Sequence, residues 1–322
     1  MRFCLPKVGE NFIMAIGNYR APFIDYTNKG IFMITMGKAP SAPFFSSLYR
    51  TGLQDKYKGT TVKFSPLGRI IFDFIRSFNN IYPEMRIDQF VIMPTHIHFI
   101  LNIRKKLDRH LDFFIEDFKI SIHREAENRG LLERNQYPFQ FGYDDQFLIH
   151  SRSLHDMYVY IWENPYRLWM RWNHPEFFRR ICDGNISGCP CQFYGNLELL
   201  KHPFKYSVVI HSAYTQDKID DLDKKWHYAI KNGGVLVSAF VNKKEKVYRD
   251  TAIREGSKII LFQNYGYKEN EKPGGWKFEM CEQGNLLIVS PKFPPDIPII
   301  GGKDHPTTKL QNRFMNSIIE RL

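Results

Sequence analysis

Residues 91–101 read Val-Ile-Met-Pro-Thr-His-Ile-His-Phe-Ile-Leu. Apolar and β-branched residues fill this stretch, which predicts buried strand structure on either side of a tight turn at the Pro-Thr pair. Side chains alternate between the faces of a strand, so His96 and His98 point one way and Ile97 the other. Two imidazoles side by side are half of a metal site. A single histidine on a strand is more often a hydrogen-bonded core or surface residue, so the pair needs a further ligand elsewhere.

A second segment, residues 153–165, reads Ser-Leu-His-Asp-Met-Tyr-Val-Tyr-Ile-Trp-Glu-Asn-Pro. Ser153 followed three residues later by Asp156 resembles a capping box, which predicts that a helix begins here. Pro165 disfavours helical geometry at Asn164, so we expect the regular helix to end or kink at that point.

Tyr160 and Asn164 are four residues apart and share one face of this helix. A phenol nucleophile with an amide oxygen beside it, close to two imidazoles, would make a phosphoryl-transfer site. Aromatic helix residues more often pack in a core, and Tyr158, Tyr160 and Trp162 could do so here.

Together the two segments resemble the single-tyrosine HUH nucleases, and the match is to the IS200-type and the REP-associated tyrosine transposases. In that family the histidine-hydrophobic-histidine strand commonly follows Val-Met-Pro, matched here by Ile-Met-Pro at 92–94. The catalytic tyrosine commonly sits in Tyr-Ile-x-x-Asn-Pro, matched at 160–165. Thr95 stands where the family commonly has Asn, which is not a ligand position. The resemblance spans roughly residues 20–175.

The resemblance implies that Tyr160 is the nucleophile and that His96, His98 and Asn164 hold Mg²⁺ or Mn²⁺. Tyr160 would attack single-stranded or hairpin DNA and leave a 5′-phosphotyrosine with a free 3′-hydroxyl, from which strands can be transferred. Tyr158 has no motif match and is not expected to be the nucleophile. By ligand type alone, two imidazoles would suit zinc equally well.

Two other classes of function stay open. One is a non-enzymatic, domesticated DNA-binding protein that kept the fold. The other is a metal-dependent phosphodiester hydrolase that uses water, with Tyr160 as a packing residue. The sequence also leaves open whether the site is built within one chain or across a homodimer.

Periodicity places further elements around the two motifs. Ser65-Pro66 predicts a helix start, with proline at the first helical position. The expected elements of the first domain are strands at 30–36, 87–93 and 96–103, helices from 66 and over 107–127, and a short strand within 137–149. The order β-α-β-β-α-β is the ferredoxin-like arrangement, an α+β fold in which an antiparallel sheet has helices on one face. We assign it to residues 1–178.

Residues 179–204 are rich in turn-forming residues, which predicts a linker or a small Cys-containing insert. This segment contains three cysteines, Cys182, Cys189 and Cys191, which suggest a zinc site but lack a fourth ligand at a suitable spacing. Residues 205–322 form the expected second domain.

In that second domain, strands alternate with helices, which predicts a Rossmann-like α/β domain with a mostly parallel sheet. The expected strands are 206–211, 235–241, 258–263 and 285–289, and the expected helices are 216–231, with Thr215 as its cap, and 243–255.

Polar residues follow the strands of this second domain, where open sheets bind ligands; they are His211, Ser212, Ser238, Asn264 and Ser290. The ligand is not identified, because the domain has neither Gly-x-Gly-x-x-Gly after a strand nor a Walker-type lysine loop. The run at 233–240 loosely resembles the Rossmann-like domains of DNA-processing protein A and of the lysine-decarboxylase-like family. The former handle single-stranded DNA.

The composition agrees with a nucleic-acid partner. The 322 residues are enough for two domains, and the formal net charge of +11 favours polyanions. Candidate phosphate contacts are Lys105, Lys106, Arg109 and Arg124. Five cysteines, an odd number, argue against a secreted disulfide scaffold. No apolar run reaches the roughly 20 residues that cross a membrane, so we expect a cytoplasmic protein without a membrane partner.

Overall fold

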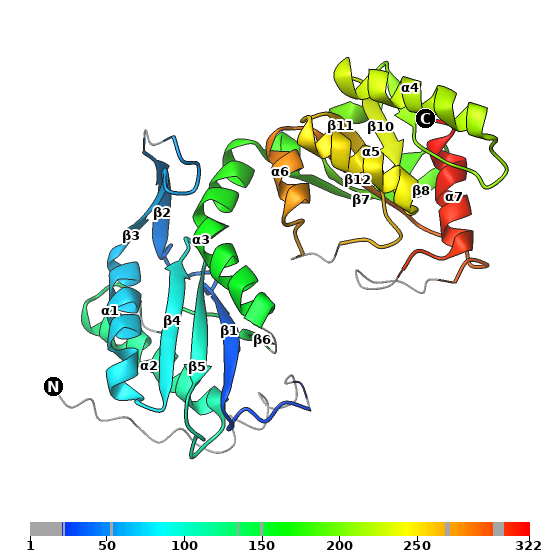
Figure 1. Ribbon diagram of the computed structural model, residues 1–322. Helices are drawn as coiled ribbons and strands as arrows, with labels where there is room; N and C mark the ends of the chain where they lie inside the picture. Colours follow the sequence, from blue (N-terminus) through cyan, green and yellow to red (C-terminus); the bar gives the residue numbers. More distant parts are fainter. Residues whose placement is uncertain are drawn as a thin grey trace. The chain divides into compact units, whose positions relative to one another are not determined.

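The computed structural model describes residues 21, 23–51, 54–133, 135–148, 151–267, 271–298 and 306–322. The chain divides into two compact units, Met1–Trp169 and Met170–Leu322, and each unit is described by itself (Figure 1). None of the helices in these described ranges is both long enough and apolar enough to cross a bilayer.

The first unit is built on a four-stranded antiparallel sheet with the strand order β4-β5-β1-β6. Its strands are β1 (Gly30–Gly37), β4 (Met85–Ile92), β5 (His96–Ile103) and β6 (Asp144–Phe147). A separate hairpin, β2 (Ser46–Arg50) and β3 (Thr60–Phe64), is inserted after β1. The β-α-β-β-α-β order expected from the sequence is therefore present, with this hairpin added.

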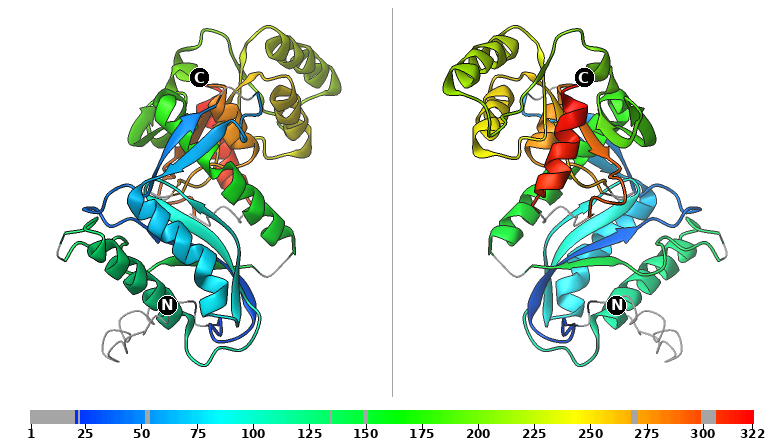
Figure 2. Two further views of the ribbon diagram at one scale, coloured as in Figure 1. Left: turned by 90° about the vertical axis from the view of Figure 1, so that its left-hand side faces the viewer. Right: turned by 90° about the vertical axis from the view of Figure 1, so that its right-hand side faces the viewer.

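Helices α1 (Pro66–Ile81) and α2 (Leu111–Asn128) lie side by side on one face of this sheet (Figures 1 and 2). Ser65 caps α1 as expected, because its Oγ accepts a hydrogen bond from the Gly68 N–H at 3.0 Å. Helix α2 begins later than the predicted residue 107, because the Nδ1 of His110 accepts from the Asp112 N–H at 3.3 Å and caps the helix there.

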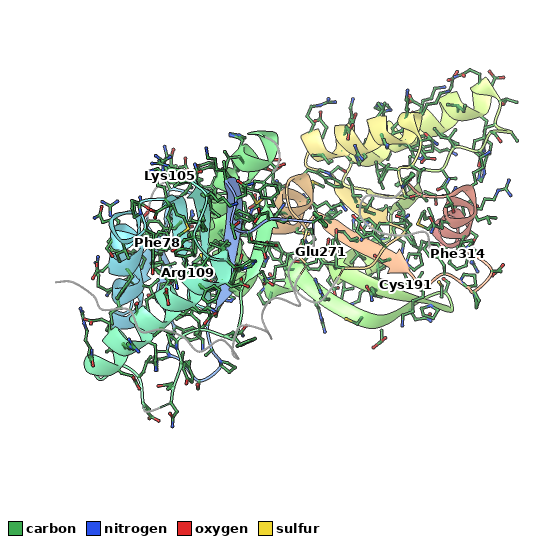
Figure 3. All side chains as sticks on the ribbon, turned by 90° about the horizontal axis from the view of Figure 1, so that it is seen from below. Phe78, Lys105, Arg109, Cys191, Glu271 and Phe314 are labelled. Carbon is green, nitrogen blue, oxygen red and sulfur yellow. The ribbon has the colours of Figure 1, made fainter. Side chains whose placement is uncertain are left out.

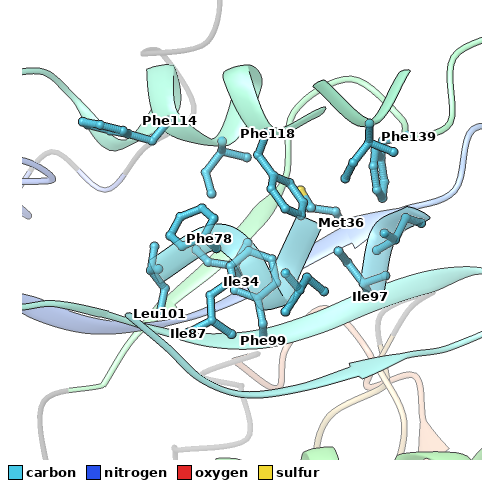
Figure 4. Packing of buried hydrophobic residues seen from close by; sticks show 14 of the residues in the cluster. Ile34, Met36, Phe78, Ile87, Ile97, Phe99, Leu101, Phe114, Phe118 and Phe139 are labelled. Atoms are coloured by element: carbon cyan, nitrogen blue, oxygen red, sulfur yellow. The ribbon is translucent and has the colours of Figure 1, made fainter. Parts of the chain in front are cut away.

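The core of the first unit lies between these two helices and the sheet. Alternate residues of β5, namely Ile97, Phe99 and Leu101, are fully buried in it. Phe99 and the α2 residue Phe118 bring their ring centroids to 6.3 Å (Figure 4). Because side chains alternate along a strand, the histidines of β5 are directed to the opposite face of the sheet.

That opposite face carries the helix α3 (Ser151–Asn173). The ring of Tyr160 contacts the ring of His98, and the Gln89 side-chain amide donates to the backbone carbonyl of Tyr158 at 3.3 Å. The expectation of helices on one face therefore holds for α1 and α2, whereas α3 covers the other face.

The limits of α3 differ from the prediction at both ends. The helix begins at Ser151, so Ser153 lies inside it rather than at its cap, and it continues through Pro165 to Asn173. A proline has the φ value of a helix and removes only one backbone donor. Ile161, Asn164 and Tyr166 are buried on both sides of it, so packing against the first unit outweighs the local preference that predicted an end.

The second unit has a six-stranded mixed sheet with mostly parallel strands, in the order β7-β8-β12-β11-β10-β9. The parallel strands are β9 (Lys205–Ser207), β10 (Val235–Ser238), β11 (Lys258–Phe262) and β12 (Leu286–Pro291). The helices are α4 (Gln216–Lys231), α5 (Lys243–Arg254), α6 (Trp276–Glu282) and α7 (Lys309–Ile319), with short 3₁₀ turns at Pro175–Phe178 and Leu197–Lys201. Thr215 caps α4 as predicted, whereas β9 and β10 are shorter than expected.

Residues 179–204, which we expected to be a linker or insert, contribute two strands to this sheet. Strand β7 (Arg179–Ile186) pairs with β8 (Cys189–Gly195), and β8 runs antiparallel to β12. The turn residues Ser187 and Gly188 form only the tip of this hairpin, where both have positive φ angles. The apolar side chains at 191 and 193 are buried under the sheet, and Figure 3 shows Cys191 on this hairpin.

A substitution at Gly68 tests how closely α1 packs against the backbone of Phe45 in the first unit. A Cβ at this position would lie 1.8 Å from the Phe45 carbonyl oxygen. Gly→Ala inside a helix ordinarily stabilises a protein by roughly 0.5–1 kcal/mol, but the overlap here should reverse the sign and cost about 1–3 kcal/mol. Thermal unfolding of Gly68→Ala should show a lower midpoint than the wild type. Arg76→Ala, an exposed change on the same helix, should leave it nearly unchanged, and a raised midpoint for Gly68→Ala would contradict this packing.

Candidate active site

The two histidines of β5 form one wall of the candidate site. Their ring centroids are 4.5 Å apart, with the ring planes at 69°. His98 is 6% exposed and His96 is half-buried. The pair therefore stands on the face of the central strand that α3 covers, as the alternation of β5 requires.

Threonine hydroxyls hold both imidazoles. Thr35, which pairs with His98 across β1 and β5, places its Oγ1 2.8 Å from the His98 Nδ1. The Oγ1 of Thr95 lies 3.1 Å from the Nδ1 of His96. When Nδ1–H donates to such a hydroxyl, the tautomer is fixed with its lone pair on Nε2. In that tautomer, Nε2 is the ring nitrogen suited to bind a cation.

Tyr160 brings the second element to the site. Its ring centroid lies 5.4 Å from that of His98, with the planes at 68°. The side chain is half-buried, so the phenol is packed against the imidazole yet partly accessible. The structure thus places the predicted nucleophile beside the predicted histidine pair within one chain.

Asn164 lies one helical turn after Tyr160 and is 5% exposed. One further turn along, the guanidinium carbon of Arg167 lies 5.8 Å from the centroid of the Tyr160 ring. Arg167 also forms an ion pair with Glu163. Successive turns of α3 therefore present a phenol, an amide and the guanidinium of an Arg–Glu ion pair.

The donor set is compatible with a divalent ion. In the parts of the chain that the structure describes, no three side chains of the His, Cys, Asp or Glu type lie together so as to hold a metal. The buried Asn164 carries a side-chain amide oxygen, a donor type that hard divalent cations accept. The same finding leaves Cys182, Cys189 and Cys191 without a zinc site among the described residues.

Tyr158 has different surroundings from Tyr160. Burial raises the pKa of the Tyr158 phenol, and the carboxylate of Asp88 raises it further, while Arg86 acts in the opposite direction. A raised pKa keeps the phenol protonated and makes it a poorer nucleophile. The choice of Tyr160 over Tyr158 rests on the motif match and stays a prediction.

Sequence reasoning missed two residues of the site. Arg167 follows Tyr160 by seven residues, a helical spacing that could have revealed it. Thr35 is distant in sequence from His98, and only the strand pairing of β1 with β5 brings the two together, so no local signal pointed to it.

The predicted phosphate contacts lie elsewhere. Lys105 follows the far end of β5, several residues beyond the histidines, and Arg109 pairs with Asp117 on α2 (Figure 3). An ion-paired Arg109 beside α2 belongs to the face of the sheet opposite the imidazoles. Lys106 and Arg124 are exposed in the same region, after β5 and on α2.

In the second unit, the polar residues at the strand ends bond to their neighbours. The Gln263 amide donates to the Ser290 Oγ at 3.2 Å, and the Asn264 amide donates to the Gln311 side chain at 3.3 Å. His211 lies 2.7 Å from a Glu320 carboxylate oxygen. A nearby cavity measures only about 10 Å³, room for about one water molecule.

Comparison with known proteins gave limited similarity. No family model matches the chain, and no significant match was found among curated proteins. A solved structure of a REP-associated tyrosine transposase bound to a REP hairpin is 15% identical, covers 45% of this chain and 73% of its own, and has a TM-score of 0.30. A putative transposase from Deinococcus radiodurans is 13% identical and has a TM-score of 0.27, and the match covers 44% of this chain and 95% of the transposase chain. Both scores are low, so function has to be inferred from the site itself.

The pKa of Tyr158 can be tested by substitution. Asp88→Asn removes a negative charge and should lower the titration midpoint of Tyr158, observed by NMR of ζ-¹³C-labelled tyrosine. The midpoint should remain above the ordinary value of about 10, because burial is the larger cause. Asp73→Asn, an exposed change on α1, serves as the control. An upward shift in Asp88→Asn would show that these neighbours are wrongly assigned.

Proposed function

We propose that the protein nicks single-stranded DNA and transfers strands through a 5′-phosphotyrosine on Tyr160, as a metal-dependent nuclease of the single-tyrosine HUH transposase type. One observation carries the proposal: the Tyr160 ring stands 5.4 Å from that of His98, which stands 4.5 Å from that of His96. A residue that only packs in the core needs no pair of imidazoles beside it. The ferredoxin-like arrangement expected for such a nuclease is consistent with the strand order of the first unit.

The chain's own residues would perform the following chemistry. The Tyr160 oxygen attacks phosphorus, the bond from phosphorus to the 3′-oxygen breaks, and that oxygen takes up a proton while the phenolic proton passes to solvent. Arg167 lies close to the phenol and pairs with Glu163, and it would bind the phosphodiester by exchanging that carboxylate for a phosphate oxygen. His96, His98 and Asn164 would hold Mg²⁺ or Mn²⁺, which when bound neutralises charge on the scissile phosphate.

The covalent product explains why strand transfer is favoured over hydrolysis. A phosphotyrosine ester keeps the energy of the original phosphodiester, so a second 3′-hydroxyl can attack it and release Tyr160. A single strand is the expected substrate, because a duplex would restrict the backbone and hide the bases. The net charge of +11 agrees with such a ligand.

Formation of the covalent adduct is the central test. The protein is incubated with labelled single-stranded oligonucleotides and Mn²⁺ and then run on a denaturing gel. Wild type and Tyr158→Phe should both give a shifted protein–DNA band. Tyr160→Phe should lose it completely, because the Tyr160 ring is the one of these two that contacts His98.

The other outcomes separate the rival functions. Cleavage without an adduct would favour a hydrolase that uses water, and binding without cleavage would favour a domesticated DNA-binding protein. Loss of the adduct in Tyr158→Phe but not in Tyr160→Phe would mean that Tyr158, and not Tyr160, is the nucleophile.

Metal binding provides a second test that does not depend on activity. Thr35→Val removes the hydroxyl that orients His98, and such changes typically weaken metal affinity about 10–100-fold. Titration of Mn²⁺ by calorimetry should show this loss, and His98→Ala should abolish binding. Thr61→Val, on the separate β2–β3 hairpin, should bind like the wild type. Unchanged affinity in Thr35→Val would exclude an orienting role for the hydroxyl.

A further inference from the structure

An open pocket of about 190 Å³ lies in the first unit between three elements. Helix α3 supplies one wall with Trp162 and Pro165, and β4 supplies another with Gln89 and Val91. The third wall is the segment before β3, which includes Tyr57. Pockets for drug-sized ligands measure roughly 300–1,000 Å³, so this one suits a single ring system.

The pocket borders the candidate active site. Trp162 follows Tyr160 by two residues on the same helix, a spacing that directs the two side chains to different faces of α3, so the link between the pocket and the site runs through β4. Val91 is the partner of His98 across the β4–β5 pair, and paired residues point to the same face of a sheet. A chain lying across Tyr160 and the imidazoles can therefore extend into the pocket.

Aromatic side chains form part of the walls, namely those of Tyr57, Phe90 and Trp162, and the last of these is largely exposed. Trp162 is 54% exposed although it lines a pocket, while its neighbour Ile161 is buried. An exposed indole contributes little to the core, but its flat face can receive another ring. Successive bases of single-stranded DNA stack on such aromatic side chains.

The segment before β3 is positively charged and is anchored to α3. The ring of Tyr57 packs edge-on against that of Tyr166 at 5.2 Å, and the Lys56 ammonium lies 5.5 Å from the Tyr166 centroid. The Arg50 guanidinium lies 5.4 Å from the Trp169 ring. These contacts hold a basic segment beside the pocket, as in grooves that track a single-stranded backbone.

Two polar side chains complete the pocket. Lys58 is 66% exposed, with Asp55 as its counter-ion at 4.0 Å, a distance and exposure at which an ion pair is weak and can be exchanged for a phosphate. Gln89 donates one N–H to the Tyr158 carbonyl. Its amide oxygen can then accept from the edge of a ring.

We propose that this pocket binds one unpaired base of the DNA strand next to the cleavage site. The base stacks on Trp162, Gln89 contacts its polar edge, and Lys58 contacts the adjoining phosphate. The proposal rests on the proposed function in taking single-stranded DNA as the ligand. The pocket would be a binding subsite that holds the strand and selects its base, separate from the residues that react.

Two exposed tryptophans on α3, one inside the pocket and one outside it, allow a controlled test. Trp162→Ala should weaken binding of a fluorescent oligothymidylate, measured by anisotropy, by about tenfold, the loss expected for one stacked base. Trp172→Ala removes a tryptophan of similar exposure (51%) from the same helix, outside the pocket, and should bind like the wild type. Trp162→Phe keeps an aromatic face and should restore most of the affinity.

A strand of the same length made of abasic nucleotides shows whether the base is the feature recognised. Wild type should bind it more weakly than oligothymidylate, and Trp162→Ala should bind it as the wild type does. Equal binding of oligothymidylate by Trp162→Ala and Trp172→Ala would overturn the proposal, as would an equal loss in Trp162→Ala for both probes.

The covalent-adduct assay keeps this test distinct from that of the nuclease. If the wild type forms no adduct but Trp162→Ala loses oligothymidylate selectively, the nuclease assignment fails and the base pocket stands. If the adduct forms and Trp162→Ala binds both probes normally, the pocket fails and the nuclease assignment stands.

Discussion

The pleat of β5 is the constraint on which the candidate site depends. Ile97, Phe99 and Leu101 are buried against α1 and α2, and the residues between them must then face α3. A shift of one residue in register would move these apolar side chains to the face that α3 covers and place the histidines between the sheet and α1 and α2, at the cost of several large hydrophobic contacts. The free energy that holds the first unit together therefore also directs both imidazoles to the same side.

Helix α3 supplies the other half of the site and shows how packing can override local preference. Its apolar and polar residues on both sides of Pro165 are buried, so the helix tolerates the missing donor and remains continuous. Continuity sets the spacing from Tyr160 to Arg167. The phenol, the amide and the guanidinium follow one another at successive turns because the helix does not end where the proline suggested.

Much of the site followed from sequence, because its spacings are local. Two histidines two apart on a strand, and a tyrosine four residues before an asparagine on a helix, must share faces whatever the tertiary structure. Thr35 could not be found in this way, because its contact with His98 depends on which strands pair. The β7–β8 hairpin was missed for a related reason: its turn residues were conspicuous, whereas the burial of residues 191 and 193 depends on the pairing of β8 with β12.

The hydroxyls of Thr35 and Thr95 at the two Nδ1 atoms have an electrostatic consequence. They are neutral, as is the amide of Asn164, and an imidazole that binds a cation is neutral as well. Such a donor set would not cancel the double charge of a bound ion, in contrast to a cage of carboxylates. The site would remain strongly electropositive when loaded, and it would discriminate in favour of anionic backbones before any base is read.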